Sequence, residues 1–133
     1  MQMFYGRRGD GQPFHTVLIR GGGLGAGAAR DGEGSFIFPA NGANTPVEIL
    51  ESDAPLIVEC RELLPDSGGA GKHRGALGRR EVFRVPDDAY APQPPVMMAL
   101  QSGRFQLPPE GLFGGLPGAR AQFLVNGRPG DPY

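Results

Sequence analysis

The stretch LLPDSGGAGKHRGALGRREVF, residues 63–83, combines the two kinds of sequence that decide the fold. It is dense in glycine and basic residues, and it runs directly into a strand-like segment, EVFRV. A glycine-rich segment with basic residues can bind a phosphate, take part in a reaction, or only reverse the direction of the chain. The neighbouring residues are needed to choose among these three roles.

Around this stretch, the chain carries short apolar runs that are rich in Val, Ile and Phe and bounded by Gly, Pro, Asn or Asp, a pattern typical of β-strands. These runs are FHTVLIR (14–20), SFIFPA (35–40), APLIVEC (54–60), EVFRV (81–85), VMMAL (96–100) and AQFLVN (121–126). VEILESDA (47–54) and CRELL (60–64) each allow one helical turn as well as a strand. We therefore predict a mainly β fold, with α+β as the alternative, in which short strands form a sandwich or a barrel.

The connections between these runs are long. A chain of 133 residues fits one domain. Its 23 glycines and 14 prolines approach the composition of disordered chains, but the apolar runs argue for a folded protein. Residues 86–95, PDDAYAPQPP, predict an exposed, extended, proline-rich connection. After it, residues 96–126 predict two strands joined by a glycine-rich turn.

The net charge and the cysteine content indicate which partners and which cellular compartment to expect. The net charge is −1 with both signs interspersed, so no field directs the chain to nucleic acid or to a membrane surface. The single cysteine, Cys60, cannot form an internal disulfide, which fits a reducing compartment. No signal peptide and no run of bilayer length is visible. We predict a cytoplasmic location, without nucleic-acid or membrane partners.

Two nucleotide-binding motifs are incomplete. IRGGGLGAGAARDG (19–32) approximates a dinucleotide fingerprint, but Asp31 and Gly32 interrupt the helix that the fingerprint needs for pyrophosphate binding. DSGGAGKHR (66–74) approximates a P-loop, but Asp66 stands where that loop needs Gly, and His73 where it needs Ser or Thr. Neither motif predicts a nucleotide site.

Other constellations in the sequence leave alternatives open. The basic residues 72–74 can meet an anion together with backbone N–H groups, or form a solvated turn. His15 and His73 lack the spacing of metal ligands, so we predict no metal site. A triad of Ser67, His73 and Asp66 would need neighbours on one turn to converge, which is rare.

The segment FPANGANTPVEILESDAPLIVE (38–59) holds polar residues close together. Asn41 and Asn44 have a structural role by default, because Asn side chains bond to their own backbone in turns. Glu48 and Glu51 lie three residues apart and can share one face of a helical turn. They can act there in acid–base catalysis or clamp a polar ligand, or simply face solvent.

The order of motifs resembles the hydantoinase B/oxoprolinase family. The matching blocks are GGGLGA, DG, N-x-x-N-T-P-V-E, E-x-x-x-P, DSGGAGKHRGALG and PPEGLFGGLPG, from about Gly6 to Gly127, and DSGG-x-G-x-x-RG is the most specific of them. The chain departs from the family at Ala76, where a second glycine usually follows Arg74 and Gly75. A methyl group there is expected to disturb a turn that needs a positive φ.

The resemblance implies that residues 1–133 are a single hydantoinase B-type fragment, from the C-terminal part of a B subunit. Its activity would be that of an ATP-dependent cyclic amide hydrolase of the hydantoinase or 5-oxoprolinase kind. The alternatives are an acetone-type ketone carboxylase subunit and a non-catalytic β-rich interaction module. Implied partners are an ATP-binding A-type subunit, the remainder of the B subunit and a small cyclic amide. ATP and Mg²⁺ would bind in the A-type subunit, with no cofactor in this fragment, and we expect the fragment alone to be inactive.

The resemblance also suggests roles for residues. It implies that residues 66–69 form a tight turn between strands, with Arg74 held close by flexible backbone. An arginine presented by N–H-rich loops suits an anionic phosphorylated intermediate. The same loops can instead brace an interface between domains. The residues expected to be catalytic are Asp66, Arg74 and Glu48, and those expected to bind substrate are Asn41, Asn44, Ser67, Gly68 and Gly69.

Overall fold

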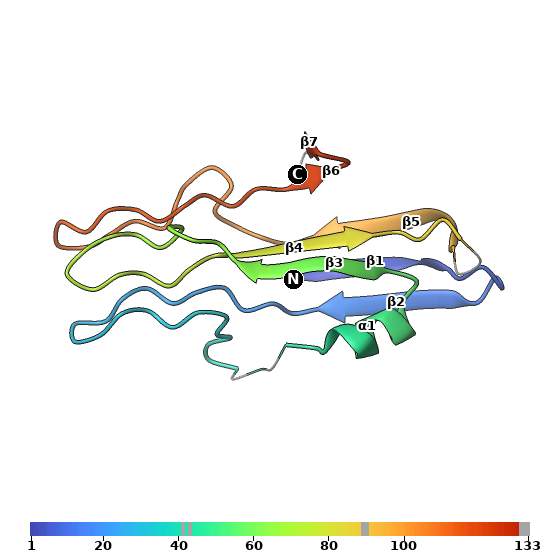
Figure 1. Cartoon of the computed structure of the whole chain (residues 1–133), viewed down its shortest axis with the longest axis horizontal. Coiled ribbons are helices and arrows are strands. Elements are labelled where there is room, and N and C mark those ends of the chain that lie inside the picture. The colour runs from blue at the N-terminus through green and yellow to red at the C-terminus, as the bar shows by residue number, and fades with distance from the viewer. Residues whose placement is uncertain (41, 43, 89–90, 131–133) are drawn as a thin grey trace. The chain divides into compact units, whose positions relative to one another are not determined.

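The computed structural model describes residues 1–40, 42, 44–88 and 91–130. Contacts divide the chain into two compact units, which are described separately. The sheet unit comprises Met1–Gly21, Ile37–Leu63 and Arg79–Gln101, and the loop unit comprises Gly22–Phe36, Leu64–Gly78 and Ser102–Tyr133. The elements are β1 (Gln2–Arg7), β2 (Pro13–Leu18), α1 (Val47–Asp53), β3 (Ile57–Leu63), β4 (Arg79–Arg84), β5 (Gln93–Leu100), β6 (Leu124–Val125) and β7 (Arg128–Pro129) (Figure 1).

The predicted mainly β fold is confirmed. The sheet unit holds an antiparallel three-stranded sheet in the order β2-β1-β5 and an antiparallel pair, β3 and β4. Both sheets contribute to one apolar core, where the rings of Phe4 in β1 and Phe83 in β4 lie 5.2 Å apart between centroids. The described strands do not close into a barrel, so the architecture follows the sandwich-like alternative.

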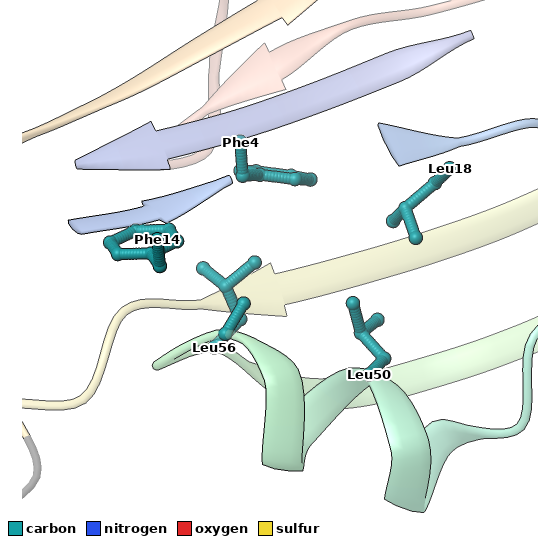
Figure 2. Close-up of a cluster of buried hydrophobic side chains, with 6 residues drawn as sticks. Phe4, Phe14, Leu18, Leu50 and Leu56 are labelled. Carbon is teal, nitrogen blue, oxygen red and sulfur yellow. The ribbon is translucent and has the colours of Figure 1, made fainter. Parts of the chain in front are cut away.

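The core follows the two-residue period of the strands. Phe14 and Leu18 share one face of β2 and are buried, whereas His15 and Val17 on the other face are exposed. Figure 2 shows Leu50 and Leu56 pointing toward the aromatic and aliphatic side chains of β1 and β2. The buried core residues are Phe4, Phe14, Leu18, Leu50, Ala54 and Leu56.

The helix α1 confirms the helical alternative for residues 47–54. It begins after Pro46. The carboxylate of Glu48 lies in the first turn, where the positive end of the helix dipole stabilises a negative charge. It ends at Ala54, whose backbone is extended because the following Pro55 disfavours a helical conformation. Leu50 and Ala54 are four residues apart, so both face the core.

Several predicted elements differ from the structure. CRELL belongs mostly to β3 and is not helical, while β1 was not among the predicted strands. SFIFPA forms only an isolated bridge between Phe36 and Gly22, so the prediction of a strand there was wrong. β5 starts at Gln93 and Pro86 is buried, which shortens the connection predicted for residues 86–95.

The predicted pairing of two strands within residues 96–126 was also wrong. β5 pairs with β1, and β6 pairs with β7, so no glycine-rich turn joins two partner strands between residues 96 and 126. Instead, Asn126 and Gly127 connect β6 to β7 with positive φ values of 51° and 74°. An Asn-Gly pair of this kind is the preferred loop of a two-residue hairpin. Within the described residues, no helix has the length and apolar character needed to cross a membrane.

Candidate functional site

The loop 64–78 is closed at its base by Ser67. The Ser67 hydroxyl donates a hydrogen bond to the Leu64 carbonyl over 2.7 Å and accepts one from the Gly78 N–H over 2.6 Å. The Leu64 N–H in turn donates to the Gly78 carbonyl over 2.8 Å. The Ser67 hydroxyl therefore already has a donor and an acceptor within the loop. The chain turns at Pro65 and Asp66, and a tight turn over residues 66–69 stays a prediction.

The loop unit is built from glycine-rich backbone packed against backbone. The Leu116 N–H donates to the Ala70 carbonyl over 2.7 Å, and the Gly75 N–H donates to the Gly69 carbonyl over 2.9 Å. A Cβ atom on Gly68 would overlap the carbonyl oxygen of Gly75, and one on Gly69 would overlap that of Leu116. Both glycines are needed because main chain lies directly against them.

The expected catalytic pair is not joined by an ion pair in the described structure. Asp66 is exposed and has a positive φ of 57°. Arg74 is also exposed, and its backbone N–H donates to Asp31 Oδ1 over 2.9 Å while its carbonyl accepts from the Gly32 N–H. Asp31 therefore fixes the backbone around Arg74 and leaves the guanidinium facing solvent.

Asp31 also faces His73. Asp31 Oδ1 lies 3.5 Å from His73 Nδ1, which makes an ion pair when the imidazole is protonated. The sequence drew attention to Asp31 only as a residue that interrupts a helix. No sequence motif links Asp31 to the basic residues 72–74, so its contacts with His73 and Arg74 could not be predicted from the sequence. Ala76, the departure from the family, is not among the described non-glycine residues with positive φ, so its backbone does not adopt the conformation in which a methyl group is expected to disturb the turn.

Two other predicted residues, Glu48 and Asn44, belong to the sheet unit. Glu48 is exposed in the first turn of α1. Asn44 is half-buried, and its Oδ1 accepts a hydrogen bond from Arg79 Nη1 over 3.1 Å. Asn41 lies outside the described residues.

Asn44 leads to a charged cluster that sequence reasoning missed. Arg20, Arg61 and Arg79 surround Glu81, and we call these four residues the arginine cluster. The distances to the Glu81 carboxylate are 3.5 Å from Arg20 Nε, 2.9 Å from Arg61 Nε and 3.7 Å from Arg79 Nε. The side chains of Arg20 and Glu81 are only 7% and 6% exposed.

Burial shapes the electrostatics of the arginine cluster. Desolvation lowers the pKa of Arg20 below its ordinary value; Glu81 opposes this shift, and Arg61 and Arg79 reinforce it. Two further contacts hold the cluster in place, because Arg61 Nη1 donates to the Thr45 carbonyl over 3.0 Å and Arg79 donates to Asn44. The cluster is thus a fixed, desolvated group of positive charges.

A cavity of about 420 Å³ also lies in the sheet unit, lined in part by Arg8, Asp10, Glu51 and Pro86. None of the residues predicted to be catalytic or substrate-binding lines it. In the part of the chain that is described, no group of three His, Cys, Asp or Glu side chains is placed to hold a metal ion.

Comparison with known proteins gives a family and a related protein. The model of a family described as hydantoinase B/oxoprolinase matches residues 1–131. The chain is also similar to the uncharacterized protein MJ0963 of Methanocaldococcus jannaschii, with 35% identity over 82 residues. That alignment covers 62% of this chain and 13% of the relative, so the chain spans a small part of the relative's length.

Proposed function

Because the chain belongs to the hydantoinase B/oxoprolinase family, we propose that it forms part of the B subunit of an ATP-dependent cyclic amide hydrolase. The observation that carries this proposal is the family match over residues 1–131, which includes the block DSGGAGKHRG around Asp66 and Arg74. The remainder of the subunit and an A-type ATP-binding subunit would complete the enzyme. The single Cys60 supports a cytoplasmic location.

In the proposed reaction, a phosphoryl group from ATP activates the carbonyl oxygen of a cyclic amide. The phosphoryl transfer breaks the terminal phosphoanhydride bond of ATP and releases ADP. One water molecule then adds to the activated carbonyl carbon and the ring C–N bond breaks, which leaves a free amine and an acyl phosphate. A second water molecule hydrolyses the acyl phosphate to a carboxylate and inorganic phosphate. ATP and Mg²⁺ belong to the partner subunit in this scheme, in keeping with the lack of P-loop spacing in this chain.

The proposal gives Arg74 the central role in this chain. Its guanidinium is exposed, while its backbone is fixed by Asp31 and Gly32. A positioned guanidinium can form paired hydrogen bonds with the oxygens of a phosphorylated intermediate. Asp66 and Glu48 are proposed as the acid–base residues. The proposed substrate contacts are Asn41, Asn44, Ser67, Gly68 and Gly69.

The test is ATP-coupled ring opening by the assembled enzyme, followed through ADP and the ring-opened product. Arg74→Ala should lower kcat by about 10²–10³-fold, the usual effect of removing one donor from a developing oxyanion. Arg30→Ala is the matched control, because Arg30 is also an exposed arginine of the loop unit and its side chain pairs, within the described residues, only with Glu33. Unchanged turnover in Arg74→Ala would reject the role of Arg74, and consumption of bicarbonate in place of water would reject the hydrolase.

A further inference from the structure

We propose that the arginine cluster of the sheet unit binds a small oxyanion, a carboxylate or a phosphate, on the guanidinium groups of Arg20, Arg61 and Arg79. The inference rests on the geometry of these side chains and does not depend on the proposed hydrolase activity. All members of the cluster belong to the sheet unit.

The arginine cluster carries more positive than negative charge. Three guanidinium groups face a single carboxylate, Glu81, at distances of 2.9–3.7 Å. The nearby acids of β3 do not balance the excess, because Glu59 pairs with Arg84 and Glu62 pairs with Arg80. Buried charges in proteins are normally paired, since desolvating an unpaired ion is costly. An oxyanion supplies the missing negative charge.

Most guanidinium nitrogens of Arg20 and Arg61 lack a hydrogen-bond partner within the described residues. All three guanidinium nitrogens of Arg20 are buried and have no hydrogen-bond partner in the described structure, and the same holds for Nε and Nη2 of Arg61. The contact from Arg61 Nε to Glu81 is close enough for an ion pair but is not directed as a hydrogen bond. Buried polar groups in folded proteins nearly always have partners. The planar fork of donors on an arginine matches the oxygens of a carboxylate or phosphate.

Two of the three arginines are held in place by hydrogen bonds, and one of these two is partly exposed. Thr45 holds Arg61 and Asn44 holds Arg79, so these two guanidinium groups are fixed without help from a ligand. The Arg61 side chain is 22% exposed, compared with 7% for Arg20. The proposal places the entry route of the anion beside Arg61, the more exposed of these two side chains.

The test is calorimetric titration of the full chain with inorganic phosphate and, separately, with acetate, at constant ionic strength set by chloride. We expect saturable binding of at least one of the two anions, with at least tenfold weaker binding in Arg20→Gln. Arg80→Gln is the matched control, since Arg80 is on β4 next to Arg79 but is exposed and paired with Glu62. Its affinity should stay within about twofold of wild type. Equal weakening in the two variants, or no binding of either anion, would overturn the proposal.

A second experiment uses the wild-type protein, so that the proposal can be tested even if Arg20→Gln does not fold. Phenylglyoxal modifies accessible arginines, and mass spectrometry reports the rate at each position. The anion that binds should slow modification of Arg61 several-fold and leave Arg80 unchanged. Equal protection of both arginines, or of neither, would overturn the proposal.

Discussion

At the scale of single residues, Ser67 shows how a small side chain can determine a loop. Its hydroxyl joins the Leu64 carbonyl and the Gly78 N–H, two groups at opposite ends of the loop 64–78. A half-buried N–H left without a partner costs more than the hydrogen bond itself contributes. Ser67 therefore stabilises the base of the loop that presents Asp66 and Arg74.

We predict that Ser67→Ala lowers the free energy of unfolding by about 1–2 kcal/mol, because it leaves the Gly78 N–H without its acceptor. Urea denaturation followed by circular dichroism measures this change. Ser52→Ala is the control, since its exposed hydroxyl makes one bond, to the Ile49 carbonyl, and its effect should stay within about 0.5 kcal/mol. Equal effects of the two substitutions would contradict the prediction.

The residues of the site could be predicted from sequence only in part. The motif around residues 66–74 identifies the loop, because its glycines and charged residues are contiguous. The arginine cluster is different, since Arg20, Arg61 and Arg79 come from separate segments and meet only through folding. Arg61 and Glu81 become neighbours through the register of β3 and β4, which no local pattern specifies.

At the scale of secondary structure, α1 contributes one buried residue, Leu50, to the core. The helix has only seven residues, too few to be stable by itself in water, so its packing on the core maintains it. Leu50 is 1% exposed, whereas its neighbour Ile49 is 50% exposed. The two residues have nearly the same size and differ in burial.

Leu50→Ala should therefore lower the free energy of unfolding by about 2–5 kcal/mol, the usual range for a buried leucine. Ile49→Ala, the matched control on the same helix, should cost no more than about 1 kcal/mol. Thermal unfolding of both variants measures the difference. A cost for Ile49→Ala as large as that for Leu50→Ala would show that α1 does not pack as described.

The strands that were predicted correctly from the sequence are those in which apolar residues recur regularly on a buried face. The period-two pattern of β2 and the apolar run before Cys60 both correspond to strands. The run at 35–40 looked similar but forms a single bridge, and Ser35 there has a positive φ of 54° that an extended strand does not allow. The glycine-rich segments direct their backbone hydrogen bonds to other loops, which no strand pattern reveals.

At the scale of the whole molecule, the chain spans 13% of the length of its relative MJ0963, and the proposed activity needs further polypeptide. We predict that the chain alone releases no phosphate from ATP in the presence of hydantoin or 5-oxoproline. The physical reason is that this chain lacks P-loop spacing and that the proposal places ATP and Mg²⁺ in the A-type subunit. A coupled phosphate-release assay, with the assembled enzyme as positive control, would contradict this if the chain alone gave a rate above background.

The strand β5 lies at an edge of the sheet β2-β1-β5, and Pro94 and Pro95 occupy its second and third positions. Proline has no N–H to offer to a neighbouring strand. At the β5 edge, an incoming polypeptide can therefore pair only along Val96–Leu100, so the prolines protect the beginning of this strand from intermolecular association. Self-assembly through this edge, if forced at high concentration, should begin at Val96.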